Sequence, residues 1–135
     1  MGAVLGKDSI DLGIVVTDSA KALAFYRDTL GLEHVADMPL STAGGTMHRL
    51  MCGTTVIKLV VLDEVPAERA APGGIQGATG YRYWTITVSN LEEVVRQCRD
   101  AGYKIALDIR EARPGLRIAM VEDPDGNWVE CIQPS

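Results

Sequence analysis

An internal repeat constrains the fold of this chain more than any other feature. A run of alternating apolar residues, a polar helix start and a helix that ends in glycine extend from Ile10 to Gly31 and occur again from Arg82 to Gly102. The last strand of each half also repeats, as Val56–Leu59 and Trp128–Cys131. A repeat of this length indicates two copies of one supersecondary unit. We therefore expect two modules with the same order of strands and helix.

Strand and helix patterns recur in each half. Alternating apolar residues are typical of a strand with one buried face, and glycine is a typical helix end. In the first half we predict a strand at 9–16 that buries Ile10, a helix from Asp18 or Ser19 to Gly31, and strands at 46–51 and 55–62. In the second half we predict a strand at 82–88, a helix from Asn90 to Gly102, and strands at 116–121 and 127–132.

These elements predict an α+β fold made of two βαβββ repeats, with a short extra strand after each helix. The first repeat covers about 8–62 and the second about 81–133. The segment 63–80 between them is rich in proline and glycine and has no periodicity, so we expect a linker or mobile flap. The helices should cover the outer face of a curved mixed sheet that encloses a cleft.

The composition indicates one cytoplasmic domain covering 1–135. A chain of 135 residues with 47% hydrophobic content can bury a core of its own. The net charge of −5, with scattered basic residues, gives no surface for nucleic acid or an anionic membrane, and no apolar run approaches the roughly 18 residues of a membrane span. The three cysteines lack CxxC spacing and lie in apolar patterns, which is typical of reduced core thiols.

Overlaying the two halves brings four polar positions into correspondence. Asp11 pairs with Tyr83, and Lys58 pairs with Glu130. By strand alternation, each side chain points away from the face that packs under a helix. We expect all four to lie on the concave side of the sheet.

Three sequence strings resemble those of a known family. The segments GIVVTD (13–18), FYRDTLGL (25–32) and DPDGNWVE (123–130) are similar to motifs of the vicinal oxygen chelate superfamily. This superfamily includes glyoxalase I, bleomycin-resistance proteins, extradiol dioxygenases, fosfomycin-resistance enzymes and methylmalonyl-CoA epimerase. The resemblance covers nearly the whole chain, and it implies that the four overlaid positions form the reactive centre.

The chain departs from the family at three of these positions. The resemblance implies His, Glu or Gln, His, and Glu as ligands of a divalent ion, and only Glu130 keeps the family residue. Asp11 and Tyr83 replace the histidines, and Lys58 replaces the first carboxylate or amide. An ammonium has no lone pair to donate and repels a cation. We infer that the family metal is absent and that the protein uses no cofactor.

The same four residues suggest proton chemistry without a metal. Members of the family often move a proton next to a carbonyl, a reaction that needs a base and an oxyanion donor. Asp11 or Glu130 is the predicted base, Tyr83 the donor, and Lys58 the group that tunes both. The first hypothesis is therefore an isomerase, epimerase or lyase that acts on a mainly apolar ketone or acyl substrate.

Other interpretations of the site remain open at this stage. The runner-up is a homodimeric binding protein of the bleomycin-resistance type, which holds a drug or natural product without turnover. Another is a metal-dependent glyoxalase-like lyase with unusual ligands that include His48 and Glu130. The four residues are also consistent with an inactive metal site kept as a buried ion pair. A Schiff-base role for Lys58 is disfavoured by the neighbouring acids.

Further residues are candidates for contact with a substrate. Whether His48 faces the cleft depends on the length of the turn at Gly53, because a shift of one residue reverses the faces of a strand. Trp128 lies two residues before Glu130, so it should share the same face and offer an aromatic wall. His34, just after the first helix, is expected to be a solvated histidine. The remaining apolar candidates on these faces are Val15, Val56, Val60 and Ile132.

Overall fold

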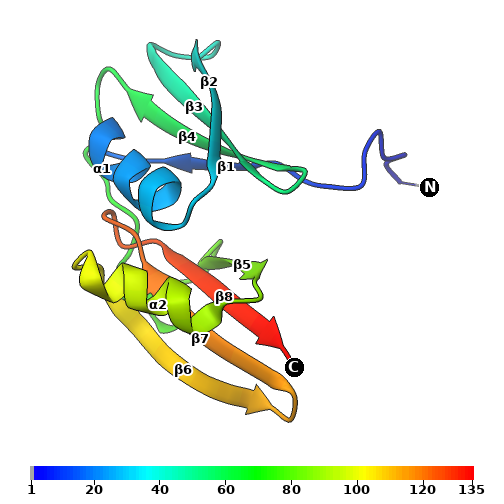
Figure 1. Cartoon of the computed structure of the whole chain (residues 1–135). Coiled ribbons are helices and arrows are strands. Elements are labelled where there is room, and N and C mark those ends of the chain that lie inside the picture. Colours follow the sequence, from blue (N-terminus) through cyan, green and yellow to red (C-terminus); the bar gives the residue numbers. More distant parts are fainter. Residues whose placement is uncertain (1) are drawn as a thin grey trace.

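Two βαβββ modules follow each other along the chain in the computed structural model, which describes residues 2–135 (Figure 1). The first contains β1 (Leu12–Val15), α1 (Ser19–Leu23), the π-helical turn η1 (Ala24–Thr29), β2 (Glu33–Pro39), β3 (Gly45–Cys52) and β4 (Thr55–Leu62). After the 3-10 turn η2 (Gly74–Gln76), the second contains β5 (Tyr83–Thr87), α2 (Leu91–Asp100), β6 (Ile105–Arg113), β7 (Leu116–Glu122) and β8 (Trp128–Pro134). The predicted α+β class and the repeat are confirmed.

Each module forms a four-stranded mixed sheet of the same topology. The strand orders are β1-β4-β3-β2 and β5-β8-β7-β6. In each sheet the first strand pairs in parallel with the last, and the other pairs are antiparallel. The parallel pairing sets Gly13 opposite Lys58 and Thr85 opposite Glu130. The pairing of first and last strands therefore brings distant segments of each repeat together.

The first strand is shorter than the alternation predicts. β1 begins at Leu12, and the preceding Ile10 is 76% exposed, so the prediction that Ile10 is buried was wrong. The N-terminal segment leaves the body of the molecule (Figure 1). Ser9 and Asp11 still bond to Thr54 and Val56, but the Ile10 side chain between them is exposed.

The helices begin and end at the predicted residues, but the first changes pitch. The Asp18 carboxylate accepts a hydrogen bond from the backbone of Lys21, which caps α1. Gly31 and Gly102 follow the two helical segments with positive φ values of 81° and 88°. Within η1 the backbone N–H of Leu30 bonds to the carbonyl of Phe25, so the turn is one residue wider than an α-helix.

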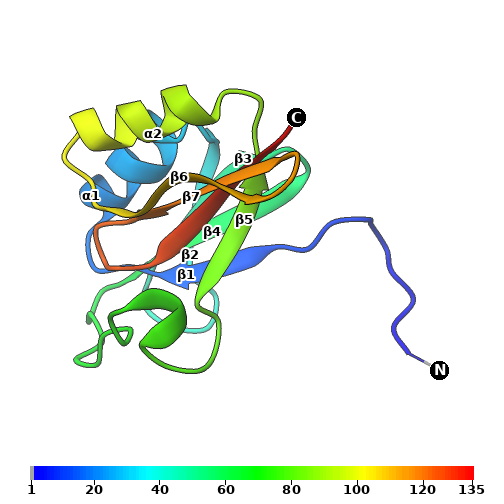
Figure 2. The same cartoon turned by 90° about the horizontal axis from the view of Figure 1, so that it is seen from below.

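Both helices lie on the same side of the two sheets, where they share one core (Figure 2). The Phe25 ring from η1 lies edge-on to Tyr103 of the second module, with centroids 4.9 Å apart. Val16 and Leu91, one from each module, belong to the same buried cluster. Each module therefore buries its helix-covered face partly against the other.

Two acidic residues of the β7–β8 turn connect this turn to the first module. The Tyr26 hydroxyl donates to Asp123 Oδ2 at 2.7 Å, and the Thr17 hydroxyl donates to Asp125 Oδ1 at 2.7 Å. Asp123 is only 4% exposed, and burial raises the pKa of its carboxyl. Burial and the neighbouring Asp123 charge also raise the pKa of Tyr26 well above its ordinary value. The hydroxyl therefore stays protonated and keeps donating to the carboxylate.

The cysteines agree with the predicted reduced state. All three are free, and Cys98 and Cys131 are buried in the core. Burial raises the pKa of Cys98 to about 11 and that of Cys131 to about 12, which keeps both thiols protonated at neutral pH. In the part of the chain that the structure describes, no helix combines the length and apolar character needed to cross a membrane.

We predict that Tyr26→Phe lowers the free energy of unfolding by about 1.5 to 3 kcal/mol, the range for a buried hydrogen bond to a charged group. The substitution leaves the ring in place and removes only the donor to Asp123. Urea denaturation measures the effect. Tyr81→Phe, at a fully exposed tyrosine, is the control and should leave the midpoint unchanged. Equal midpoints for the two variants would show that the buried bond contributes nothing to stability.

Candidate functional site

The face of each sheet that is turned away from the helices, called here the open face, carries the four overlaid residues. In β4, Ile57 and Leu59 are fully buried on the helix side, which puts Lys58 on the open face. In β8, Val129 and Cys131 are likewise buried on the helix side, so Glu130 lies on the open face. The alternation of strand side chains thus predicted these directions from the sequence.

Asp11 and Lys58 form a charged pair on the open face of the first sheet. Lys58 Nζ lies 3.8 Å from Asp11 Oδ2, and Lys7 Nζ lies 2.6 Å from Asp11 Oδ1. The backbone N–H of Val56 also points to Asp11 Oδ1 at 3.4 Å. The pKa of Asp11 is lower than its ordinary value, mainly because Lys7 donates a hydrogen bond to the carboxylate. The charge of Lys58 lowers this pKa further. A carboxylate held in this way is a weakened base.

Tyr83 and Glu130 lie on the open face of the second sheet. Glu130 accepts a hydrogen bond from the Thr85 hydroxyl at 2.8 Å, between strands β8 and β5. Tyr83 is 48% exposed, and its hydroxyl makes no hydrogen bond to another residue within 2–135. The phenol is therefore free to donate to a bound molecule.

Within one chain the two pairs stay apart. No hydrogen bond or ion pair between described residues joins Asp11 or Lys58 to Tyr83 or Glu130. The cause is the packing of the modules, because a shared core on the helix side turns both open faces away from it.

The four residues do not fit the divalent ion that the family resemblance implies. The Lys58 ammonium lies beside the Asp11 carboxylate, at the position where a cation would bind that group. It offers no lone pair and adds a repelling charge. Only Glu130 retains a ligand typical of the family, so the donor set is poor for a metal.

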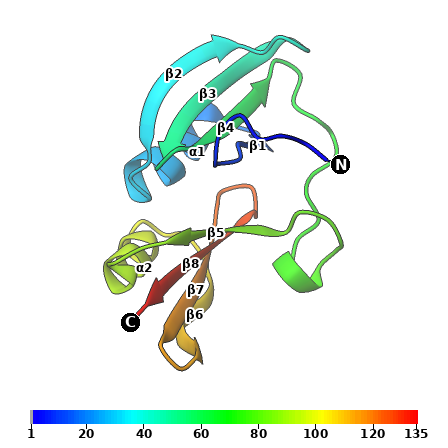
Figure 3. The ribbon, with the colours of Figure 1, turned by 90° about the vertical axis from the view of Figure 1, so that its right-hand side faces the viewer.

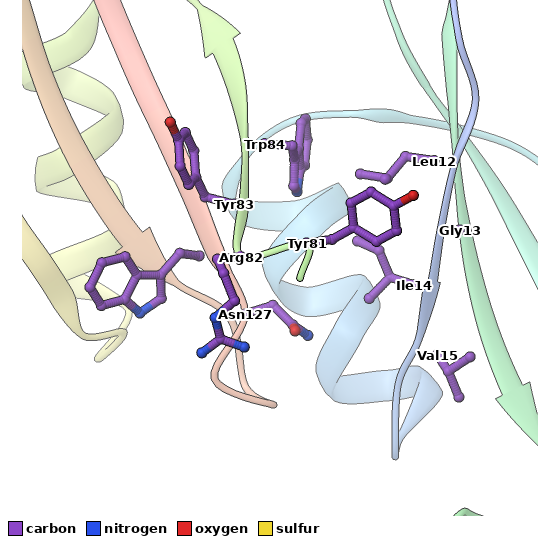
Figure 4. Close-up of a pocket in the computed structure, with 10 residues that line it drawn as sticks. Leu12, Gly13, Ile14, Val15, Tyr81, Arg82, Tyr83, Trp84 and Asn127 are labelled. Atoms are coloured by element: carbon purple, nitrogen blue, oxygen red, sulfur yellow. The ribbon is translucent and has the colours of Figure 1, made fainter. Parts of the chain in front are cut away.

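A cavity of about 260 Å³ lies between the edges of β1 and β5 (Figure 4). Neither edge pairs with the other, so the space between the two sheets stays open. The walls are mainly aromatic and aliphatic. The lining residues are Leu12, Gly13, Ile14, Val15, Tyr81, Arg82, Tyr83, Trp84, Asn127 and Trp128.

Trp84 lines this cavity and carries an unsatisfied donor. Its Nε1 atom is buried and has no hydrogen-bond partner among the described residues. A buried N–H without a partner costs free energy. The sequence interpretation missed Trp84 as a site residue because the alternation assigns it to the helix side. The signal available was the cluster of three aromatic residues at Tyr81, Tyr83 and Trp84.

The segment 63–80 is anchored over the second sheet. Gly74 lies directly on the Trp128 indole, and a Cβ atom at Gly74 would come within 2.3 Å of that ring. The Arg82 guanidinium donates to the carbonyls of Gly74 and Ala71, both at 2.6 Å. Figure 3 shows the segment passing from β4 to β5 with the η2 turn within it. The segment connects the two repeats and contains the short η2 turn, which contacts Trp128 through Gly74.

The other residues that the sequence predicted as substrate contacts are divided between the helix side, the cavity and the open faces. The β3–β4 turn has two residues, so His48 pairs with Leu59 and faces the helix side. His48 therefore does not lie beside Lys58, and it contacts Ser19 and Asp37 instead. Val15 and Trp128 line the cavity. On the open faces, Val56 and Val60 are buried and Ile132 is half-buried.

Comparison with known proteins agrees with this architecture. The sequence profile of the Glyoxalase/Bleomycin resistance protein/Dioxygenase superfamily matches residues 9–131. No curated protein gives a significant match to the chain.

Solved structures show the same fold. A glyoxalase family protein from Enterococcus faecalis is 21% identical, with a TM-score of 0.73 and coverage of 94% of this chain and 98% of the other. TnmS3, an antibiotic binding protein from Streptomyces sp. CB03234, is 23% identical, with a TM-score of 0.68 and coverage of 98% and 100%. FosX, a fosfomycin resistance protein from Listeria monocytogenes solved with Mn(II) and sulfate, is 15% identical, with a TM-score of 0.68 and coverage of 98% and 95%.

We predict that Gly74→Ala releases the segment 63–80 from Trp128. The new methyl group would clash with the indole, and the φ of +56° adds about 1 to 2 kcal/mol of backbone strain. Cleavage by trypsin after the exposed Arg69 should accelerate by about tenfold or more. Gly53→Ala is the matched control, because Gly53 has a φ of +58° and no atom within 4 Å of the added methyl. If both variants are cleaved at the wild-type rate, the segment is not held by this contact.

Proposed function

Because this chain belongs to the Glyoxalase/Bleomycin resistance protein/Dioxygenase superfamily, and because its own cavity is mainly aromatic, we propose that it binds a flat, largely apolar small molecule without altering it. The observation that carries this proposal is the cavity between β1 and β5. Ligand sites in proteins are typically concave and apolar with a few polar groups that orient the ligand. This cavity has that composition.

The polar groups of the cavity indicate which ligand it suits. The Tyr83 hydroxyl is a donor without a protein partner in the described chain, and Tyr83 is half exposed at the cavity. A ligand with carbonyl or quinone oxygens on a ring system would accept from it and stack against the aromatic walls. Arg82 is occupied by the backbone carbonyls of Gly74 and Ala71, so a negative charge on the ligand is not required.

The state of Asp11 favours binding over turnover. Its carboxylate is held by Lys7 at 2.6 Å, and its pKa is lowered, so it binds a proton weakly. A general base works best when its pKa lies near the working pH. TnmS3, an antibiotic binding protein with the same fold, is a precedent for a non-catalytic role.

A homodimer is part of this proposal. Large apolar side chains are exposed on the N-terminal segment and at the cavity mouth, among them Leu5, Ile10, Val15 and Tyr81. Exposed apolar patches of this kind mark surfaces that bind a partner. A second copy placed on the open faces would cover them and would set the Asp11 and Lys58 pair of one protomer against the partner's Tyr83.

A second candidate function is proton transfer next to a carbonyl, at the site such a dimer would form. The free Tyr83 hydroxyl favours it, since an oxyanion donor must have no competing acceptor. Glu130 would then be the base in place of Asp11, because among the described residues its carboxylate is bonded only to the neutral Thr85 hydroxyl and not to a cation. Lys58 would stabilise the negative charge that develops on the substrate.

We predict that anthraquinone sulfonate binds more tightly than anthracene sulfonate, which has the same ring shape without carbonyl oxygens. Tyr83→Phe should remove this preference, weakening the quinone by about fivefold to tenfold and leaving the anthracene unchanged. Calorimetric titration of the purified protein measures both affinities. Tyr103→Phe, which changes an aromatic residue outside the cavity, is the control. Equal affinity for the two probes in the wild type would contradict an acceptor bound at Tyr83.

We predict that, if the site transfers protons, the protein accelerates exchange of the acidic C–H protons of beta-tetralone in deuterated water, followed by NMR. Glu130→Gln and Tyr83→Phe should each lower this rate by about a hundredfold or more. Mixing Lys58→Met protomers with Tyr83→Phe protomers should restore part of the activity, since one site of the mixed dimer is then intact. Exchange at the solvent rate in the wild type would eliminate the enzymatic candidate and leave the binding function.

A further inference from the structure

Three potential metal ligands converge on the helix side of the first sheet, on the face opposite to the one discussed above. They are His34 and Asp37 on β2 and His48 on β3. Their ligand atoms all lie within 4.8 Å of one another. This cluster includes none of the four overlaid residues and none that line the cavity between β1 and β5.

A β-bulge brings the three side chains to one face. In a regular strand His34 and Asp37, three residues apart, would point to opposite faces. The register shifts between His34 and Ala36, so Val35 is the inserted residue. As a result Asp37 lies directly opposite His48, and His34 lies opposite the buried Leu50 on the same side. Bulges that redirect a side chain are common next to functional sites.

The three side chains already meet at one oxygen. His34 Nε2 lies 2.5 Å from Asp37 Oδ1, and His48 Nδ1 lies 2.6 Å from the same atom. Ligands around an ion at about 2.0 to 2.2 Å lie roughly 3 Å apart, so binding requires the carboxylate to withdraw by less than about 1 Å. Asp37 is on the edge strand of the sheet and its side chain is 53% exposed, which leaves it free to make this adjustment.

A neighbouring hydroxyl orients the buried histidine. Ser19 Oγ lies 2.8 Å from His48 Nε2, on the side of the ring opposite to Asp37. When Nε2–H donates to Ser19, the lone pair of Nδ1 points to the cluster, which is the tautomer that a ligating histidine needs. His48 is only 7% exposed, so this orientation is held by its surroundings.

The local charge is also suitable for a cation. Asp37 contributes one negative charge at the centre of the cluster. Arg27 approaches His34 Nδ1 at 3.4 Å, but it is paired with Asp28 at 2.8 Å, which offsets its charge. Arg27 is exposed, so it can move aside when His34 turns its Nδ1–H outward. The net charge of these neighbours is therefore negative.

We propose that His34, Asp37 and His48 bind a divalent transition-metal ion of the zinc type, with water at the open coordination position. Two imidazoles and one carboxylate suit zinc, cobalt or nickel and not the oxygen-preferring magnesium or calcium. The ion would connect the edge strand β2 to β3, and through His48 and Ser19 to the start of α1. Its role is to hold this edge of the first module.

Titration of the untagged, chelator-treated full chain with Co²⁺ tests the site by its visible absorption, and competition with Zn²⁺ gives the affinity for zinc. We expect one ion per chain and a higher melting temperature with Zn²⁺. His34→Gln and Asp37→Asn, at positions with exposed side-chain atoms, should each weaken binding by at least about tenfold, and Ser19→Ala by a similar factor.

The double variant Asp11→Asn with Glu130→Gln is the matched control, because it alters the open faces and leaves the cluster intact. It should bind the ion as the wild type does. Circular dichroism of each metal-free variant verifies that the fold is retained. The proposal is overturned if no stoichiometric ion binds, if His34→Gln and Asp37→Asn bind as the wild type does, or if the control variant loses the ion.

Discussion

The relative position of the two modules depends on the buried Asp123 carboxylate and its bond to Tyr26. The turn residue Asp123 accepts backbone N–H groups from its own turn and the hydroxyl of Tyr26 from the other module. A buried carboxylate is costly unless its oxygens are satisfied, and here each oxygen has partners. The interaction therefore specifies one docking geometry for the helix faces, which apolar packing alone would define less sharply. The bond from Thr17 to Asp125 supports the same geometry from the end of β1.

The packing of the two modules against each other determines which sheet faces and strand edges remain available for binding. Because both helices are buried on one side, both open faces are available on the other, and the edges of β1 and β5 meet without pairing. The space between those edges is the aromatic cavity, and the segment 63–80 covers part of the adjacent sheet through Gly74 and Trp128. Of the four overlaid residues, Asp11 and Lys58 lie on the open face of the first sheet, and Tyr83 and Glu130 lie on that of the second, where Tyr83 also lines the cavity.

Much of this architecture could be predicted from the sequence. The exceptions arise from inserted residues, from the length of one turn and from long-range contacts. Strand alternation and the glycines after each helix predicted the modules and the faces of Lys58 and Glu130, since both depend on local periodicity. Periodicity fails where a residue is inserted. The bulge at Val35 turns Asp37 toward His34, and the wide turn η1 buries Phe25 beside Tyr26. The face of His48 depended on the length of one turn, and the anchoring of Gly74 depends on a long-range contact that leaves no local pattern.

The pairing of the first strand with the last has a consequence for the order in which the protein folds. The first sheet is complete once β4 has left the ribosome, because β1 pairs with β4. Its helix side, however, then still lacks Leu91, Val95 and Tyr103, which the second module contributes to the core cluster that contains Phe25 and Tyr26. A nascent first module thus carries exposed apolar surface until β8 closes the second sheet, and such surface favours aggregation. The two halves look like independent units in the sequence, yet the core that they share makes the stability of each depend on the other.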